Sequence, residues 1–227
     1  MLVLALDPPF GSKEENSSFI RTVEETKDYV LGYKIGLPLI LQEGAGVISQ
    51  VKKISHKKVI ADLKLADIGD IMVSTLRKLS SFEVDAVIAH GFIGVDDGID
   101  KLVEESRTLS IDVIIVASMS HKGSTRYLDK HYEDIVQDAL NLRVHGIVVP
   151  ATRLDIIRKT REKVGNKLKL YSPGIGAQGA MPGDAICSGA DFEIVGRYIT
   201  RSDNPGKRAQ EIYQAQLEKV RLCLGSQ

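Results

Sequence analysis

The sequence predicts an α/β fold, a single-domain (β/α)₈ TIM barrel that spans residues 1–227. Short apolar segments alternate with amphipathic helical segments, which is the pattern of a parallel sheet. The alternation occurs eight times without a linker or a change in composition, and eight such units in about this length fit a closed barrel. Polar side chains also recur where the strands end. An open doubly wound sheet is the alternative.

Each strand is recognised as a short apolar run rich in β-branched residues, and each helix as the longer segment that follows it. We expect strands at 2–6, 33–36, 59–63, 86–89, 113–117, 146–149, 169–171 and 192–195. We expect helices at about 14–30, 38–54, 68–79, 95–107, 132–142, 153–164, 183–188 and 205–224. Residues 118–129 form a longer loop, Phe10 covers the barrel mouth, and the last helix packs on the barrel through Ile212, Leu217, Val220 and Leu224.

Composition excludes several classes of protein. The chain has 30 basic and 30 acidic side chains, so nothing in its net charge indicates a nucleic-acid partner. Residues 1–6 are too short for a signal peptide, and no apolar run reaches the length of a membrane span. Cys187 and Cys223 are far apart and lack a His/Cys cluster, which predicts neither a zinc site nor a disulfide. We therefore expect free thiols in a reducing, cytoplasmic compartment.

Polar residues follow the strands at one end, and in a barrel these positions ring the mouth where active sites are built. Any one of them could be incidental, but their recurrence at equivalent places indicates a site. They are Asp7, Lys34, Asp62, Lys64, His90, Ser118, Ser120, Pro150, Pro173, Gly174, Gly196 and Arg197.

The segment 58–70 carries the densest charge. Asp62 and Lys64 are two apart on one strand and therefore point the same way, and Asp67 lies just past its end. With Lys34 they alternate in sign, so if they converge each cation lies beside carboxylates. A lysine kept protonated in this way suits delivery of a proton to a carbanion rather than Schiff-base chemistry. Asp62 would repel an anionic substrate group, and loss of carbon dioxide would relieve that repulsion. A structural salt-bridge network is the alternative.

A glycine-rich loop follows the seventh predicted strand, and Gly196-Arg197 follows the eighth. Barrels commonly bind phosphate with these two loops. Glycines let backbone N–H groups approach an anion, Gln178 adds an amide donor, and Arg197 adds a forked charge. The pair of loops therefore predicts a phosphate site, with a flexible turn and a surface arginine as the alternative.

Several motifs together resemble the orotidine 5′-monophosphate decarboxylase family over nearly the whole chain, and most closely its compact microbial and archaeal branch. They are Leu-Ala-Leu-Asp7, Lys34-Ile-Gly, Asp62-Leu-Lys-Leu-Ala-Asp67-Ile, His90-Gly-Phe, Met119-Ser-His121, Ser172-Pro-Gly-Ile-Gly-Ala-Gln178 and Val195-Gly-Arg197. The resemblance implies cofactor-free, metal-free decarboxylation of orotidine 5′-monophosphate (OMP) to UMP and carbon dioxide in pyrimidine biosynthesis. It also implies a homodimer whose active sites are shared across the interface, without nucleic-acid or membrane partners.

The resemblance also implies residue roles. Lys64 protonates C6 of the pyrimidine, and Asp62 lies against the departing carboxylate. Lys34 and Asp7 hold the ribose hydroxyls, while Asp67 and Ile68 reach the partner's site. The remaining substrate-binding residues are Ser120 at the pyrimidine edge, Gln178 between base and phosphate, and Pro173, Gly174, Gly176, Ala177, Gly196 and Arg197 around the phosphate.

The chain departs from the family pattern at three positions. Gly69 replaces a frequent proline, and Ile71 replaces a threonine that reaches a ribose hydroxyl, so the resemblance does not carry that cross-subunit contact over to this chain. Lys122 stands where a proline usually follows Met-Ser-His, which predicts a more mobile loop.

Two other functions remain open. Metal-dependent decarboxylases and synthases of keto-sugar phosphates share the Asp/Lys/Asp spacing, but they carry a glutamate ligand where this chain has Lys34, and a cation there should repel magnesium. A catalytically silent nucleotide-phosphate binder could use the same scaffold, although it would not need buried alternating charge.

Overall fold

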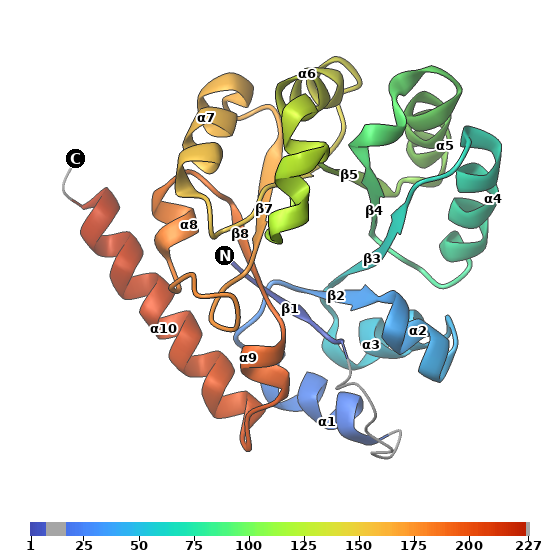
Figure 1. The fold of residues 1–227 in the computed structure, drawn as a ribbon. Coiled ribbons are helices and arrows are strands. Elements are labelled where there is room, and N and C mark those ends of the chain that lie inside the picture. The colour runs from blue at the N-terminus through green and yellow to red at the C-terminus, as the bar shows by residue number, and fades with distance from the viewer. Residues whose placement is uncertain (8–16, 226–227) are drawn as a thin grey trace.

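The computed structural model describes residues 1–7 and 17–225, so Phe10 and the first residues of the predicted 14–30 helix lie outside the described part. Eight parallel strands close into a barrel in sequence order, with β8 pairing back to β1 (Figure 1). This confirms the predicted TIM barrel. The strands are β1 (Leu2–Ala5), β2 (Gly32–Gly36), β3 (Lys58–Leu65), β4 (Ala86–His90), β5 (Asp112–Val116), β6 (Gly146–Val148), β7 (Lys169–Pro173) and β8 (Phe192–Val195).

Helices surround the barrel, and the ribbon shows the long α10 running past α1, α9 and α8 (Figure 1). The α-helices are α1 (Ser17–Thr26), α2 (Leu37–Glu43), α3 (Val47–Ser55), α4 (Gly69–Ser80), α5 (Asp100–Leu109), α6 (Tyr132–Asn141), α7 (Leu154–Val164), α8 (Asp184–Cys187), α9 (Arg197–Thr200) and α10 (Pro205–Leu224). Shorter helical turns are η1 (Gly91–Ile93), η2 (Val95–Ile99), η3 (Lys122–Arg126) and η4 (Leu128–His131).

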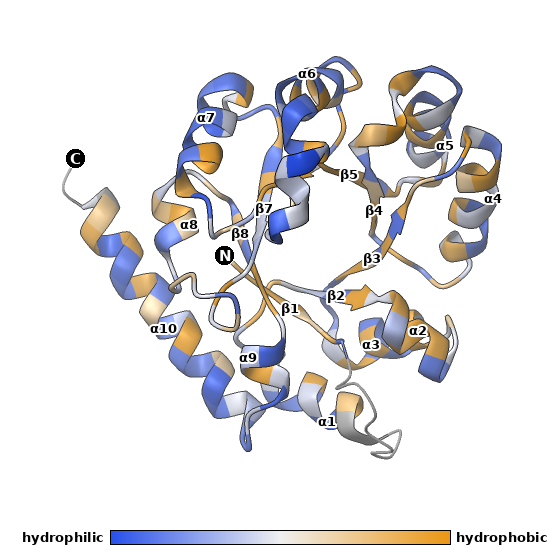
Figure 2. Ribbon diagram, in the orientation of Figure 1, coloured by the Kyte–Doolittle hydropathy of each residue, from blue (hydrophilic) through white to orange (hydrophobic). Residues whose placement is uncertain are grey.

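The strands separate two apolar layers because successive side chains point to opposite faces. In β1, Val3 and Ala5 belong to the cluster inside the barrel, whereas Leu2 and Leu4 belong to the larger cluster between strands and helices. Colouring by hydropathy shows the strands as mostly apolar and the outer faces of the helices as mostly polar (Figure 2). The barrel is therefore a packed core, and polar groups concentrate at its rim.

Two predicted helices differ in detail, and one short helix was not predicted. The 38–54 helix is two helices, because Gly44 ends α2 at a φ of 77°, a conformation that favours glycine. The 95–107 helix begins with the distorted turn η2, in which Asp96 and Asp97 are not helical, and continues as α5. A further short helix, α9, follows β8 directly and was not predicted because four residues carry no periodicity.

The third strand is longer than predicted and ends irregularly. Its pairing with β4 shifts between Ala61 and Leu65, and Lys64 has a φ of 46°, which few residues other than glycine adopt. The bulge lies at the end of the charged segment. It therefore sets the direction in which Lys64 leaves the strand.

The prediction of free thiols was wrong, because Cys187 and Cys223 form a disulfide. The long α10 lies against α8, which brings the two Cα atoms to 5.9 Å, within the usual range for a disulfide. The same contact holds an ion pair of 2.9 Å between Lys219 and Asp184. As predicted, α10 packs on the barrel: Ile212 is buried and Leu217 is half-buried, whereas the Leu224 side chain lies outside the described part.

Candidate active site

Four charged side chains at the mouth of the barrel form a chain of alternating sign. Lys34 Nζ lies 3.3 Å from Asp7 Oδ2 and 3.0 Å from Asp62 Oδ2. Lys64 Nζ lies 2.9 Å from both carboxylate oxygens of Asp62. The order is therefore Asp7, Lys34, Asp62, Lys64, drawn from the ends of three adjacent strands.

Burial makes the central pair interdependent. Lys34 and Asp62 are each 7% exposed. Burial alone would lower the pKa of Lys34, but the nearby Asp62 and Asp7 carboxylates hold that pKa above its ordinary value. Burial alone would raise the pKa of Asp62, but Lys34 and Lys64 hold it below its ordinary value. Both groups therefore stay ionised, because each compensates the desolvation of the other.

Asp67 does not join this chain within one polypeptide. β3 ends at Leu65, and the backbone turns outward into α4, so Asp67 is exposed and its Oδ1 accepts a hydrogen bond of 2.8 Å from the Ile68 N–H. The second carboxylate of the chain is Asp7 instead. Asp7 lines the cavity and its side chain is 39% exposed, so its carboxylate can still accept a bond from a ligand.

The charged chain lines a cavity of about 340 Å³ that reaches the glycine-rich loop. Asp7, Lys34, Asp62 and Lys64 lie at one end. The predicted residues at the other end are Ser120, Pro173, Gly174, Ala177, Gln178, Gly196 and Arg197. Asp67, Ile68 and Gly176 are not among the lining residues. The structure thus brings the two predicted halves of the site into one pocket.

The glycine-rich loop packs on α9. A Cβ atom at Gly176 would lie 2.4 Å from the ring of Tyr198, and Gly176 has a φ of 71°, so only glycine fits there. Gly176 therefore supports the loop from behind rather than lining the cavity. Arg197 begins α9 and lines the same pocket.

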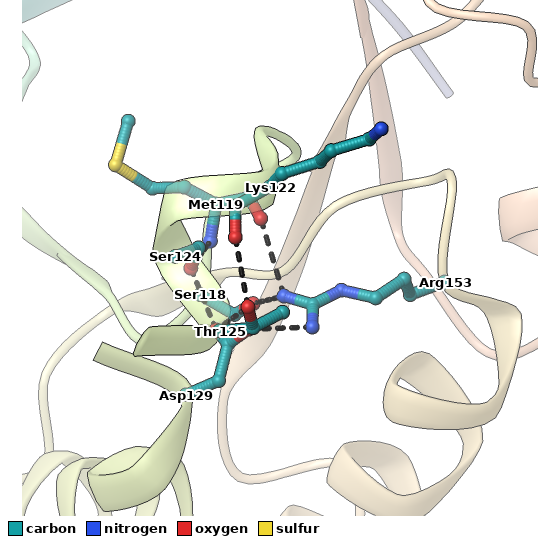
Figure 3. Close-up of polar contacts among 7 residues, drawn as sticks. All are labelled: Ser118, Met119, Lys122, Ser124, Thr125, Asp129 and Arg153. Carbon is teal, nitrogen blue, oxygen red and sulfur yellow. Dashed lines mark hydrogen bonds and ion pairs between the residues drawn. The ribbon is translucent and has the colours of Figure 1, made fainter. Parts of the chain in front are cut away.

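A polar network fixes the loop that carries Ser120 (Figure 3). Arg153, which precedes α7, donates to Asp129 Oδ2 at 2.6 Å and to the Met119 carbonyl at 3.1 Å, and also contacts the Ser118 hydroxyl. Asp129 Oδ1 accepts from Ser118 at 2.9 Å and from Ser124 at 2.6 Å. Burial would raise the pKa of Asp129, but these hydrogen bonds and the Arg153 charge hold it below its ordinary value.

Sequence reasoning missed this network, because Asp129 and Arg153 lie in different loops and match no motif. It also missed Arg201, which lines the cavity beside Arg197. An arginine one helical turn after a predicted phosphate ligand was the available signal. Within the described ranges, no group of three or more His, Cys, Asp or Glu side chains is arranged to hold a metal ion. None of the described helices has the length and apolar character needed to cross a bilayer.

Comparisons with known proteins agree with this geometry. The family model described as "Orotidine 5'-phosphate decarboxylase / HUMPS family" matches residues 1–212. An orotidine 5′-phosphate decarboxylase of Sulfurisphaera tokodaii is 40% identical over 204 residues, covering 90% of this chain and 93% of the relative. One from Pyrococcus abyssi is 37% identical over 213 residues, covering 94% and 97%.

Solved structures give the same result. The orotidine 5′-monophosphate decarboxylase of Methanocaldococcus jannaschii, complexed with the inhibitor BMP, is similar with a TM-score of 0.87 and 33% identity, covering 95% of this chain and 97% of that chain. The enzyme of Pyrococcus horikoshii has a TM-score of 0.85 and 34% identity, covering 96% and 99%.

Proposed function

The chain belongs to the orotidine 5′-phosphate decarboxylase / HUMPS family, and from this we infer that it converts OMP to UMP and carbon dioxide in pyrimidine biosynthesis. The relatives named above all carry the decarboxylase name over nearly the full length of this chain. The observation that carries the proposal is the Asp7–Lys34–Asp62–Lys64 chain, which shares one cavity with a glycine-rich loop and Arg197.

We propose that Asp62 and Lys64 carry the chemistry. The carboxylate of OMP would lie against Asp62, which Lys34 and Lys64 keep ionised, so the two anions repel each other in the ground state. Cleavage of the C6–carboxylate bond leaves its electron pair on C6 and releases carbon dioxide. Lys64 then donates a proton from Nζ to C6, which gives UMP. The proposed reaction steps use no metal or organic cofactor.

The other cavity residues would hold the nucleotide. The part-exposed Asp7 carboxylate and the Lys34 ammonium suit the ribose hydroxyls, and Ser120 suits the edge of the pyrimidine. Gln178 would bridge base and phosphate. The phosphate would lie against Gly196, Arg197 and the loop residues Pro173, Gly174 and Ala177, with Gly176 supporting that loop from behind. Binding energy from this remote group would support the reaction at C6.

We propose that two copies of the chain form a homodimer in which Asp67 and Ile68 complete the partner's site. Asp67 is exposed, and the apolar residues Ile68 and Ile71 that follow it in sequence are 66% and 49% exposed. Phe92, which follows the neighbouring strand β4, is 59% exposed. Exposed large apolar side chains of this kind are typical of an interface. Because Ile71 cannot donate a hydrogen bond, Asp67 would make the cross-subunit contact alone.

Release of carbon dioxide from OMP by the purified chain tests the function. We expect turnover that survives exhaustive chelation. Activity that vanished on chelation and returned with magnesium would favour the metal-dependent branch that acts on keto-sugar phosphates. UMP binding without any release of carbon dioxide would favour a silent nucleotide binder.

We place the protein in the cytoplasm on the basis of this proposed role. The Cys187–Cys223 disulfide is unusual for a reducing compartment, but intracellular proteins of hyperthermophiles are rich in such bonds. Labelling of free thiols in freshly lysed cells would test whether the bond exists where the protein works.

A further inference from the structure

The phosphate end of the cavity contains a second arginine to which no role has been assigned. Arg201 and Arg197 both line the pocket, at the end where the glycine-rich loop meets α9. The Arg201 N–H donates to the Arg197 carbonyl at 3.1 Å, so the two residues are one helical turn apart and on the same face. The fold therefore places two arginines, one helical turn apart, in the lining of a small cavity.

Neither guanidinium group is neutralised by a side chain in the described part of the protein. Among the described residues, no carboxylate forms an ion pair with Arg197 or Arg201. The nearby Arg208 differs: it pairs with Glu211 at 3.2 Å and lies over the Tyr198 ring at 4.9 Å. Like charges one turn apart repel each other modestly. An anion bound between the two arginines attracts both of them and so offsets their repulsion.

We propose that Arg201 is a second phosphate-binding residue, which acts with Arg197 on the 5′-phosphate of the nucleotide. The inference rests on the proposed function. A phosphate monoester carries close to two negative charges at neutral pH and has three acceptor oxygens. After Arg197 and the backbone N–H groups of the glycine-rich loop have bound, the phosphate oxygens can still accept further hydrogen bonds. The Arg201 guanidinium supplies both the second positive charge and the additional N–H donors. Arg201 would thus favour phosphorylated over unphosphorylated nucleosides.

The test compares Arg201→Gln, Arg201→Lys and the wild type in binding UMP and uridine, and in turnover of OMP. Arg158→Gln is the matched control, because Arg158 is an exposed arginine on α7 that does not line the cavity. We expect Arg201→Gln to raise the dissociation constant for UMP about tenfold, as loss of a charge-assisted hydrogen bond does. Arg201→Lys should recover part of the loss, and Arg158→Gln should bind like the wild type. Uridine should bind all four proteins equally.

Three results would overturn the role of Arg201: UMP affinity within twofold of the wild type in Arg201→Gln, an equal loss for uridine, or an equal loss in Arg158→Gln. Stabilisation by inorganic phosphate in thermal melts gives a second measure that needs no turnover, and it should be smaller for Arg201→Gln. A wild type that releases no carbon dioxide from OMP contradicts the proposed function instead, and the phosphate melts still decide the role of Arg201.

Discussion

The two ends of the cavity differ in whether their charged side chains are paired with opposite charges in the protein. At the β1–β3 end, Lys34 and Asp62 are buried and paired, so their charges are compensated before a ligand arrives. At the β7–β8 end, Arg197 and Arg201 are exposed and have no carboxylate partner in the described structure. The first arrangement is preorganised, which suits groups that act on developing charge. The second depends on its ligand for charge neutralisation, which suits recognition. The difference suggests that chemistry and binding can be impaired separately.

Removing the amine of Lys64 should give the largest effect. We expect Lys64→Ala to lower kcat by about a thousandfold or more, because a positioned proton donor is lost, while UMP still binds through the other end. Carbon dioxide release and UMP titration measure the two properties. Lys58→Ala, at the opposite end of the same strand, is the control and should keep full turnover. Parallel loss of UMP binding in Lys64→Ala would show that the two ends are not separable.

Breaking the disulfide should lower the stability of the fold without changing the residues at either end of the cavity. The bond joins residues 36 apart in sequence, and the chain-entropy relation gives a stabilisation of about 4 kcal/mol for a loop of that size. We expect Cys223→Ser to lower the free energy of unfolding by up to that amount and to leave kcat at 25 °C unchanged. Urea unfolding with and without a thiol reductant measures this difference in the free energy of unfolding. The reductant should lower the free energy of unfolding of the wild type and leave that of Cys223→Ser unchanged.

Removing Arg197 should impair recognition alone. We expect Arg197→Ala to lower kcat/KM for OMP about a hundredfold, because a forked, charge-assisted contact with the phosphate is lost. Binding of an unphosphorylated nucleoside should not change. Comparable losses for both ligands would remove Arg197 from the phosphate site.

Loosening the Ser120 loop should have a smaller effect. Arg153→Ala removes the contacts with Asp129 and the Met119 carbonyl, so the loop would lose its fixed position beside the pyrimidine. We expect KM for OMP to rise about tenfold and the pKa of Asp129 to move up toward its ordinary value. Arg158→Ala on the following helix serves as the control. Unchanged KM would mean that the loop is held by its backbone alone.

The smallest effect concerns pH. The folded-state pKa of Asp62 is lowered below 3.8, so its stabilisation is present above pH 3.8 and is lost as the pH falls through the folded value. The folded-state pKa of Lys34 is raised above 10.5, so its stabilisation is full below pH 10.5 and is lost as the pH rises through the folded value. We expect the difference in unfolding free energy between the wild type and Lys34→Met/Asp62→Asn to be flat between these limits and to change outside them. Urea unfolding across pH would show whether that is so.

Local pattern was enough to predict the barrel and most of the cavity. All eight strands were recognisable because each is a short apolar run, and the ends of those runs marked Asp7, Lys34, Asp62 and Lys64. The break at Gly44 was missed although Gly44 and Gly46 lie two residues apart, which is a signal for the end of a helix. The pairings Cys187–Cys223 and Asp129–Arg153 were missed because contacts between residues 36 and 24 positions apart depend on how helices and loops pack. The position of Asp67 depended on where β3 turns outward, which the strand pattern does not encode.

The disulfide also closes a covalent ring that runs through β8, α9 and most of α10. A protease that cuts once inside this ring, for example trypsin at the exposed Arg201, would produce two fragments that still migrate as one species on a gel. They would separate only after a thiol reductant is added. A single cut between Cys187 and Cys223 would therefore leave the rest of α10 covalently attached to the barrel.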